Sequence, residues 1–130
     1  KYEGINLLII KKIMGKLSTH VLDTAHGKPA AGLRLEFFEL NGNFRQLVMT
    51  ITTNQDGRTD ALLLTPESIR VGTFELVFYV GDYFEGLGLK LPNPKFLDVV
   101  PVRFSIFDKE QNYHVPLLVS PYSYSTYRGS

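Results

Sequence analysis

The stretch Gly72-Thr73-Phe74-Glu75-Leu76-Val77-Phe78-Tyr79-Val80 is the clearest β-strand in the sequence. Its large apolar residues Phe74, Leu76, Phe78 and Val80 recur at every second position, so an extended backbone places them all on one face. Branched and aromatic side chains dominate the stretch, and these residues favour strands. The sequence therefore predicts a sheet that turns one face toward a core at this point.

Similar short runs, separated by turn residues, extend in both directions from this strand. We predict one short helix at residues 82–87 and further strands at residues 17–23, 33–40, 46–53, 59–64, 99–107, 113–119 and 122–127. The segments 41–43 and 54–57 are strong turn signals. Pro101 inside a strand run indicates an edge or a bulge, because proline has no N–H to donate. Roughly eight short strands with at most one helix indicate an all-β fold, an antiparallel sandwich.

Composition narrows the possible functions. The chain has 130 residues, enough for one domain with its own core. Its net charge of +1 offers no broad basic surface, so we predict no nucleic-acid partner. The absence of cysteine excludes disulfides and a thiolate nucleophile. The apolar run at residues 5–10 is too short to span a bilayer, so no membrane partner is predicted.

The N-terminal part is interpreted separately from the domain. Met14-Gly15 resembles a natural start, so residues 1–13 are interpreted as an N-terminal extension, either native or non-native, and the domain is expected to span residues 14–130. No targeting signal is visible. The expected compartment is therefore the bacterial cytoplasm, with the periplasm and the peroxisome left open.

Histidine is scarce, and two of the three histidines lie inside predicted strands. His20 and His114 occupy positions opposite the more apolar face, whereas His26 falls in a turn. A lone strand histidine is more often a bystander than a catalyst, although its pKa near neutrality suits acid–base chemistry. His26 is interpreted as a solvated turn residue. Asp23 could orient His20 or cap a turn, and the second role is more common.

Two further polar features are candidates for a site. Arg58 directly follows the turn at 54–57. It is either an exposed charge at a strand end or a fixed cation that polarises a carbonyl. The segment Tyr127-Arg128-Gly129-Ser130 either frays like most tails or ends inside a site. The histidines lack carboxylates at ligand spacing, and no phosphate loop or hydrolase motif is present, so neither a metal nor a cofactor is predicted.

Three segments resemble the signatures of the transthyretin-like family. One is His20-Val21-Leu22-Asp23 followed by Gly27, Pro29-Ala30 and Leu33; a second runs from Tyr113-His114-Val115-Pro116 to Tyr124-Ser125-Thr126. The third joins residues 72–76 to Gly81-Asp82-Tyr83-Phe84. The resemblance covers about residues 15–130. It implies an eight-stranded sandwich of two four-stranded sheets with one short helix, and a homotetramer (a dimer of dimers) with a central channel.

The family contains hydrolases and hormone carriers, and four positions separate them. Transthyretins have Lys, Glu and Thr where this chain has His20, Arg58 and His114, and they continue into a longer tail where this chain stops at Ser130. All four positions take the hydrolase form. The resemblance thus implies hydrolysis of 5-hydroxyisourate to 2-oxo-4-hydroxy-4-carboxy-5-ureidoimidazoline in urate degradation. The alternatives are a transthyretin-type carrier that binds thyroid hormone without turnover and a purely structural sandwich.

The implied site lies between subunits and has assigned roles. His20 and His114 position a water, with at least one imidazole as general base, and Arg58 stabilises the oxyanion. Arg58 should also lower the pKa of a nearby imidazole. Tyr127 and Ser130 complete the hydrogen bonds to the substrate ring. His20, Arg58, His114 and Ser130 are thus expected to be catalytic, and His20, Arg58 and Tyr127 to bind substrate.

Overall fold

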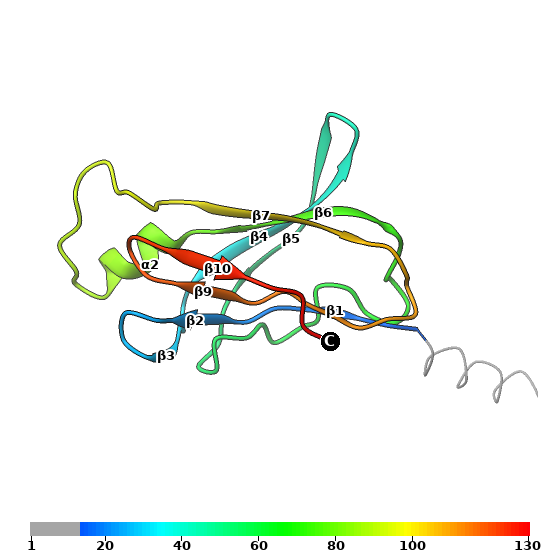
Figure 1. Cartoon of the computed structure of the whole chain (residues 1–130), viewed down its shortest axis with the longest axis horizontal. Helices are drawn as coiled ribbons and strands as arrows, with labels where there is room; N and C mark the ends of the chain where they lie inside the picture. The colour runs from blue at the N-terminus through cyan, green and yellow to red at the C-terminus, as the bar shows by residue number, and fades with distance from the viewer. Residues whose placement is uncertain (1–13) are drawn as a thin grey trace, which may run out of the picture.

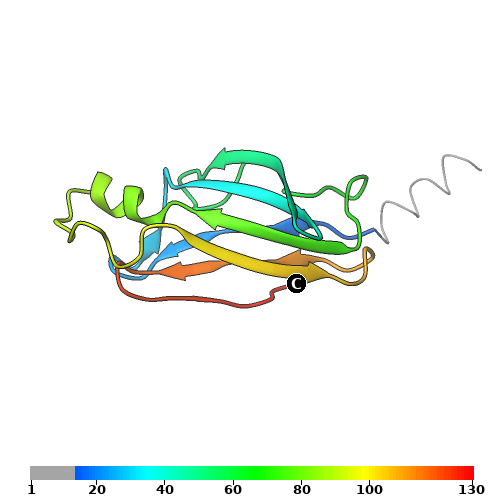
Figure 2. The same cartoon turned by 90° about the horizontal axis from the view of Figure 1, so that it is seen from above.

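The computed structural model describes residues 14–130, so the prediction about residues 1–13 lies outside it. Two sheets pack face to face, as the two views in Figures 1 and 2 show. One sheet has the strand order β5-β4-β6-β7 and the other the order β10-β9-β2-β3. The all-β sandwich expected from the spacing of strands and turns is confirmed.

The first sheet is antiparallel throughout. It consists of β4 (Arg34–Asn41), β5 (Phe44–Thr52), β6 (Gly72–Phe78) and β7 (Val100–Ile106). The predicted turn at 41–43 joins β4 to β5, and Gly42 there has a φ of 62°, which only glycine adopts at little cost. Since β7 is an edge strand, the position of Pro101 is explained as predicted.

The second sheet contains the strands that directly follow His20 and His114 along the chain. It consists of β2 (Val21–Asp23), β3 (Lys28–Pro29), β9 (Leu117–Val119) and β10 (Tyr124–Thr126). A two-stranded ladder of β1 (Leu17–Ser18) and β8 (Tyr113–His114) leads into β2 and β9.

The β1–β8 and β2–β9 pairs are parallel, which departs from a wholly antiparallel sandwich. Most of the chain separates the two segments, so no hairpin imposes an antiparallel direction. Backbone hydrogen bonds continue the ladder between the named strands: the N–H of Val115 donates to the carbonyl of Ser18 at 3.0 Å, and the N–H of Leu117 donates to that of His20 at 2.9 Å.

The core lies between the sheets, and the predicted strand face supplies much of it. Phe74, Leu76, Phe78 and Val80 are all fully buried. The other large buried side chains include Leu17, Val21, Leu35, Phe37, Phe84 and Leu117.

Val80 is the first residue of helix α2 (Val80–Gly86) rather than the last of the strand, so the helix begins before the predicted residue 82. No helix within residues 14–130 is both long and apolar enough to cross a membrane.

The predicted strand at residues 59–64 is wrong. Only isolated bridges at Arg58 and Leu64 connect this segment to the sheet. Side chains here satisfy local partners instead: the hydroxyl of Thr59 donates to the carbonyl of Ala61 at 2.6 Å, and Asn54 Nδ2 donates to Asp60 Oδ1 at 2.9 Å. Such local bonds compete with a sheet ladder, which explains why a β-compatible composition did not produce a strand.

Candidate active site

His20 and His114 form a pair on the outer face of the second sheet. The alternation along residues 17–21 turns Leu17, Thr19 and Val21 into the core and leaves His20 on the opposite face, half-buried. The parallel β1–β8 ladder brings His114 beside it. Nδ1 of His20 lies 2.5 Å from Nε2 of His114, and the ring centroids are 4.7 Å apart. Two histidines that are remote in sequence thus share one hydrogen bond.

Arg58 lies across an isolated antiparallel bridge from His20. The preceding turn holds it there, because the N–H of Val21 donates to the carbonyl of Gly57 at 2.8 Å. Gly57 has a φ of 72°, and a Cβ atom at this position would lie 2.5 Å from that strand's Val21 carbonyl oxygen. The close approach of turn and strand therefore requires glycine. The turn predicted at residues 54–57 thus places the backbone of Arg58 next to that of His20.

The surroundings favour neutral imidazoles. Burial lowers the pKa of His20, and the positive charge of Arg58 lowers it further. Burial also lowers the pKa of His114, with added repulsion from His20 and Arg58. Since an unperturbed histidine titrates near pH 6.5, both rings are neutral at pH 7 and retain an unprotonated nitrogen. Both rings of the pair therefore keep a nitrogen that can accept a proton, and their role as a base stays a prediction.

The C-terminal segment is anchored against His114 rather than frayed. The N–H of Gly129 donates to the carbonyl of His114 at 2.7 Å, and the N–H of His114 donates back to Gly129 at 3.1 Å. Arg128 donates to Gln111 Oε1 at 2.8 Å and lies over the ring of Tyr113, 4.6 Å from its centroid. Ser130 follows directly and is exposed. The tail thus ends next to the histidine pair.

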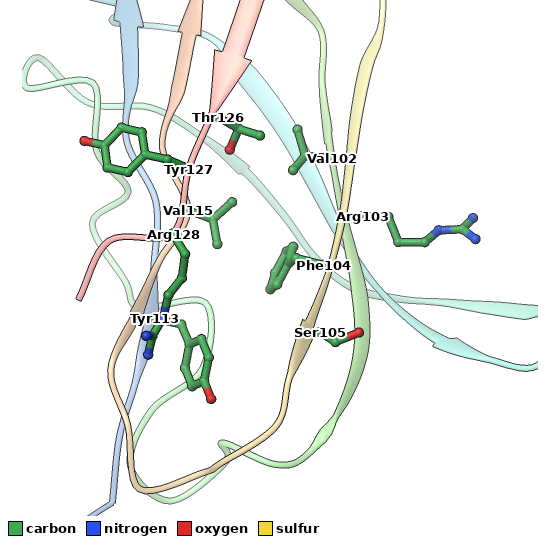
Figure 3. Close-up of a pocket in the computed structure, with 9 residues that line it drawn as sticks. All are labelled: Val102, Arg103, Phe104, Ser105, Tyr113, Val115, Thr126, Tyr127 and Arg128. Carbon is green, nitrogen blue, oxygen red and sulfur yellow. The ribbon is translucent and has the colours of Figure 1, made fainter.

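Tyr127 directly follows β10 and lies two residues before Gly129, which pairs with His114. It lines a cavity of about 260 Å³ between the edge strands β7 and β10, together with Val102, Phe104 and Val115. Figure 3 shows the Tyr127 ring turned away from Val102 and Phe104. Within residues 14–130 no hydrogen bond joins Tyr127 to either histidine. The role of Tyr127 in substrate binding therefore stays a prediction.

The third histidine belongs to a structural cluster at the other end of β2. Nδ1 of His26 lies 2.6 Å from Oδ2 of Asp23, and the His26 N–H donates to Oδ1 at 3.0 Å. The hydroxyl of Tyr83 donates to the same carboxylate at 2.8 Å, and Asp23 is fully buried. Asp23 therefore caps the turn and does not orient His20. The interpretation of His26 as a turn residue is confirmed.

Ser18 is a member of the site that sequence reasoning did not select. Its Oγ lies 2.7 Å from Nδ1 of His114, on the nitrogen that His20 does not use. The alternation already placed Ser18 on the same face as His20, but only the β1–β8 register shows that it adjoins His114. Within residues 14–130 no group of three or more histidine, aspartate or glutamate side chains is arranged to hold a metal ion.

Two unprotonated imidazoles near an arginine suit the hydrolysis of a polarised carbonyl group. An imidazole can take a proton from water, and the cation can stabilise an oxyanion. They are carried here on the outer face of a transthyretin-like sandwich. The HIUase/Transthyretin family model matches residues 17–129, and the chain belongs to this family. The resemblance seen in the three sequence segments is confirmed.

Relatives and solved structures agree with this assignment. The 5-hydroxyisourate hydrolase 2 of Rhizobium meliloti strain 1021 is 56% identical over 116 residues, which cover 89% of this chain and 97% of that protein. The structure of Klebsiella pneumoniae 5-hydroxyisourate hydrolase superposes with a TM-score of 0.73 at 29% identity, covering 90% of this chain and 100% of the other. A crystal structure of (S)-allantoin synthase matches with a TM-score of 0.85 at 40% identity. It covers 97% of this chain, which spans about half (48%) of that longer one.

Proposed function

We propose that this chain hydrolyses 5-hydroxyisourate to 2-oxo-4-hydroxy-4-carboxy-5-ureidoimidazoline. The observation that carries the proposal is the hydrogen-bonded pair of His20 and His114 with Arg58 across the bridge from His20. The names of the similar proteins point to the same substrate. A carrier that only encloses a hormone has no need of paired neutral bases beside a fixed cation, so the enzyme is favoured over the transthyretin-type alternative.

The reaction splits an amide bond within a ring. A water oxygen bonds to the carbonyl carbon while one imidazole of the pair takes a proton from that water. The bond from this carbon to the ring nitrogen then breaks, and the imidazolium returns the proton to the departing nitrogen. The ring opens to a carboxylic acid, which loses its proton to solvent to become a carboxylate, and to a ureido group, and the imidazole pair is restored. Water is consumed, and the histidines are unchanged after one cycle.

Arg58 has two tasks in this scheme. Its backbone is bridged to that of His20, and its guanidinium would stabilise the negative charge that develops on the carbonyl oxygen. The same charge keeps the imidazoles unprotonated, because a second positive charge nearby is unfavourable. Lysine would preserve the charge but not the planar fork that can bond two oxygens of the substrate at once.

Tyr127 and Ser130 complete the site in the proposed homotetramer, a dimer of dimers with sites between subunits. Leu22 and Leu118 pair across β2 and β9 on the same outer face as the histidines and are only half-buried in the single chain. A second subunit on this face would cover them and close the site over its substrate. Pro116, two residues before Leu118, is already buried in the single chain.

The test of the activity uses substrate made in place. Urate oxidase converts urate to 5-hydroxyisourate, and loss of the product's ultraviolet absorbance is followed with and without this protein. We expect a marked acceleration, and none from a double variant His20→Asn/His114→Asn that keeps its fold. No acceleration by the wild-type protein, together with tight binding of thyroid hormone, would establish the carrier instead.

The assembly is tested separately. Sedimentation velocity should give the mass of four chains for the wild-type protein. Leu118→Asp places a charge on the outer face and should shift the protein toward smaller species and lower the activity with them. A fully active monomer of either protein would remove the subunit interface from the site.

A further inference from the structure

Ser18 lies at one end of a chain of three hydrogen-bonding side chains. The parallel register sets Ser18 opposite His114, and its Oγ is 2.7 Å from Nδ1 of that ring. Nε2 of the same ring is 2.5 Å from Nδ1 of His20. Both nitrogens of His114 are thus hydrogen-bonded, whereas Nε2 of His20 has no hydrogen bond to any residue from 14 to 130. The order of the groups is serine, His114, His20 and then the open end of the site.

The protons on this chain have two possible orders. Each neutral imidazole carries one N–H. In the first order, Nδ1–H of His20 donates to His114, whose own Nδ1–H donates to Ser18, and Nε2 of His20 is bare. In the second order every donor is reversed, and Nε2 of His20 carries a proton. A hydroxyl can donate or accept a hydrogen bond. Whether Ser18 donates to His114 or accepts from it is therefore coupled to the protonation of Nε2 of His20.

The position of Arg58 distinguishes these two orders. Arg58 pairs across the isolated bridge with His20, and its charge acts on both rings. Arg58 is bridged to His20 and not to His114, so its charge is introduced at the His20 end of the chain. A lone pair facing a cation is more favourable than an N–H facing it, and a guanidinium at this end therefore favours the first order. The hydroxyl of Ser18 completes this order at the inner end by accepting from Nδ1–H. Without that acceptor, Nδ1–H of His114 would lose its partner in a half-buried place.

We propose that Ser18 is a positioning residue of the hydrolytic site: by accepting a hydrogen bond from His114 it holds the pair with Nε2 of His20 unprotonated. This assigns His20 as the base that takes the proton from water, and His114 as the ring that orients it. The inference rests on the proposed hydrolase function for its kinetic consequence, but the proton order itself exists without substrate. Ser18 touches no reacting atom.

The first measurement needs no variant and no substrate. Long-range ¹H–¹⁵N correlation spectra of the imidazole rings distinguish an Nδ1–H from an Nε2–H ring. At neutral pH we expect the Nδ1–H form for both His114 and His20. An Nε2–H form of His114 in the folded wild-type protein would overturn the proposal, whatever the activity. A protein with the expected spectrum but no hydrolysis would instead refute the proposed function alone.

The second measurement combines spectra with kinetics. Ser18→Ala should move His114 away from a pure Nδ1–H form and lower kcat about tenfold, the scale of one ordinary hydrogen bond, with KM changed less than twofold. Ser18→Thr keeps the hydroxyl and should restore both readouts. Ser105→Ala is the matched control, because Ser105 lies exposed in β7 of the other four-stranded sheet and its hydroxyl is hydrogen-bonded to that of Thr73. A Ser18→Ala variant with an unchanged spectrum and kcat would overturn the proposal.

Discussion

Gly129 lies so close to His114 that a Cβ atom at this position would be 3.2 Å from the Cβ of His114 and 3.5 Å from its Cδ2. The two residues also exchange both backbone hydrogen bonds, so neither can withdraw easily. Glycine is needed here for close approach and not for an unusual backbone angle. The backbone at Gly129 therefore packs against one side of His114 and limits the movement of its ring.

This contact makes Gly129→Ala a sensitive test of the tail. The methyl group should displace the His114 ring by a few tenths of an ångström and lower kcat by about tenfold, because small displacements of a base are costly. The free energy of unfolding should change by less than about 1 kcal/mol. Steady-state kinetics and urea unfolding measure the two effects.

Gly86→Ala is the control for this substitution. Gly86 ends helix α2, and a Cβ atom there meets nothing within 4 Å. The change should leave kcat unchanged and raise stability by about 0.5–1 kcal/mol, as alanine does in a helix. Full activity of Gly129→Ala would mean that the tail does not position His114.

Replacing either paired histidine tests the base. His20→Asn and His114→Asn should each lower kcat by ~10² to 10⁴-fold, the range that general-base catalysis supplies. Both variants should fold, because the two rings lie on an outer face and the core is untouched. His26→Asn is the matched control and should retain wild-type turnover. Near wild-type rates for both paired variants would assign the base elsewhere.

Burial lowers the pKa of both paired imidazoles most, and the charge of Arg58 lowers each pKa further. The pKa values of both rings lie below the ordinary 6.5, so kcat/KM should begin to fall only below pH 6.5, as the base becomes protonated. Arg58→Gln removes the repulsion and should raise the pKa of both imidazoles in an NMR titration. Arg58→Lys should leave these pKa values nearly unchanged, and Arg58→Glu should abolish hydrolysis. Unchanged pKa values in Arg58→Gln would refute this electrostatic role.

A further prediction concerns stability alone. Tyr83 joins α2 to β2 through its hydrogen bond to the fully buried carboxylate of Asp23. Tyr83→Phe leaves that acceptor with one bond fewer and should cost about 1–3 kcal/mol in urea unfolding, with kcat unchanged. Tyr79→Phe removes a hydroxyl that donates to Glu36 on a partly exposed face, so it should cost less. Equal losses in the two variants would show that burial of Asp23 is not the cause.

The sequence by itself determined the features that depend on a few neighbouring residues. Alternation along residues 17–23 and 72–80 decided which side chains face the core, because successive residues of a strand point to opposite sides. The glycines at 42 and 57 located the tight turns, and Pro101 marked an edge strand. Each of these is a property of the local backbone and needs no knowledge of distant partners.

Only the tertiary structure decided which distant groups meet. The parallel register of 17–23 against 113–119 joins Ser18, His114 and His20. Residues 59–64 had the composition of a strand, yet local side-chain bonds took the place of a ladder. The physical reason is that register and pairing between remote segments follow from packing the whole core, whereas alternation is already present in each segment alone.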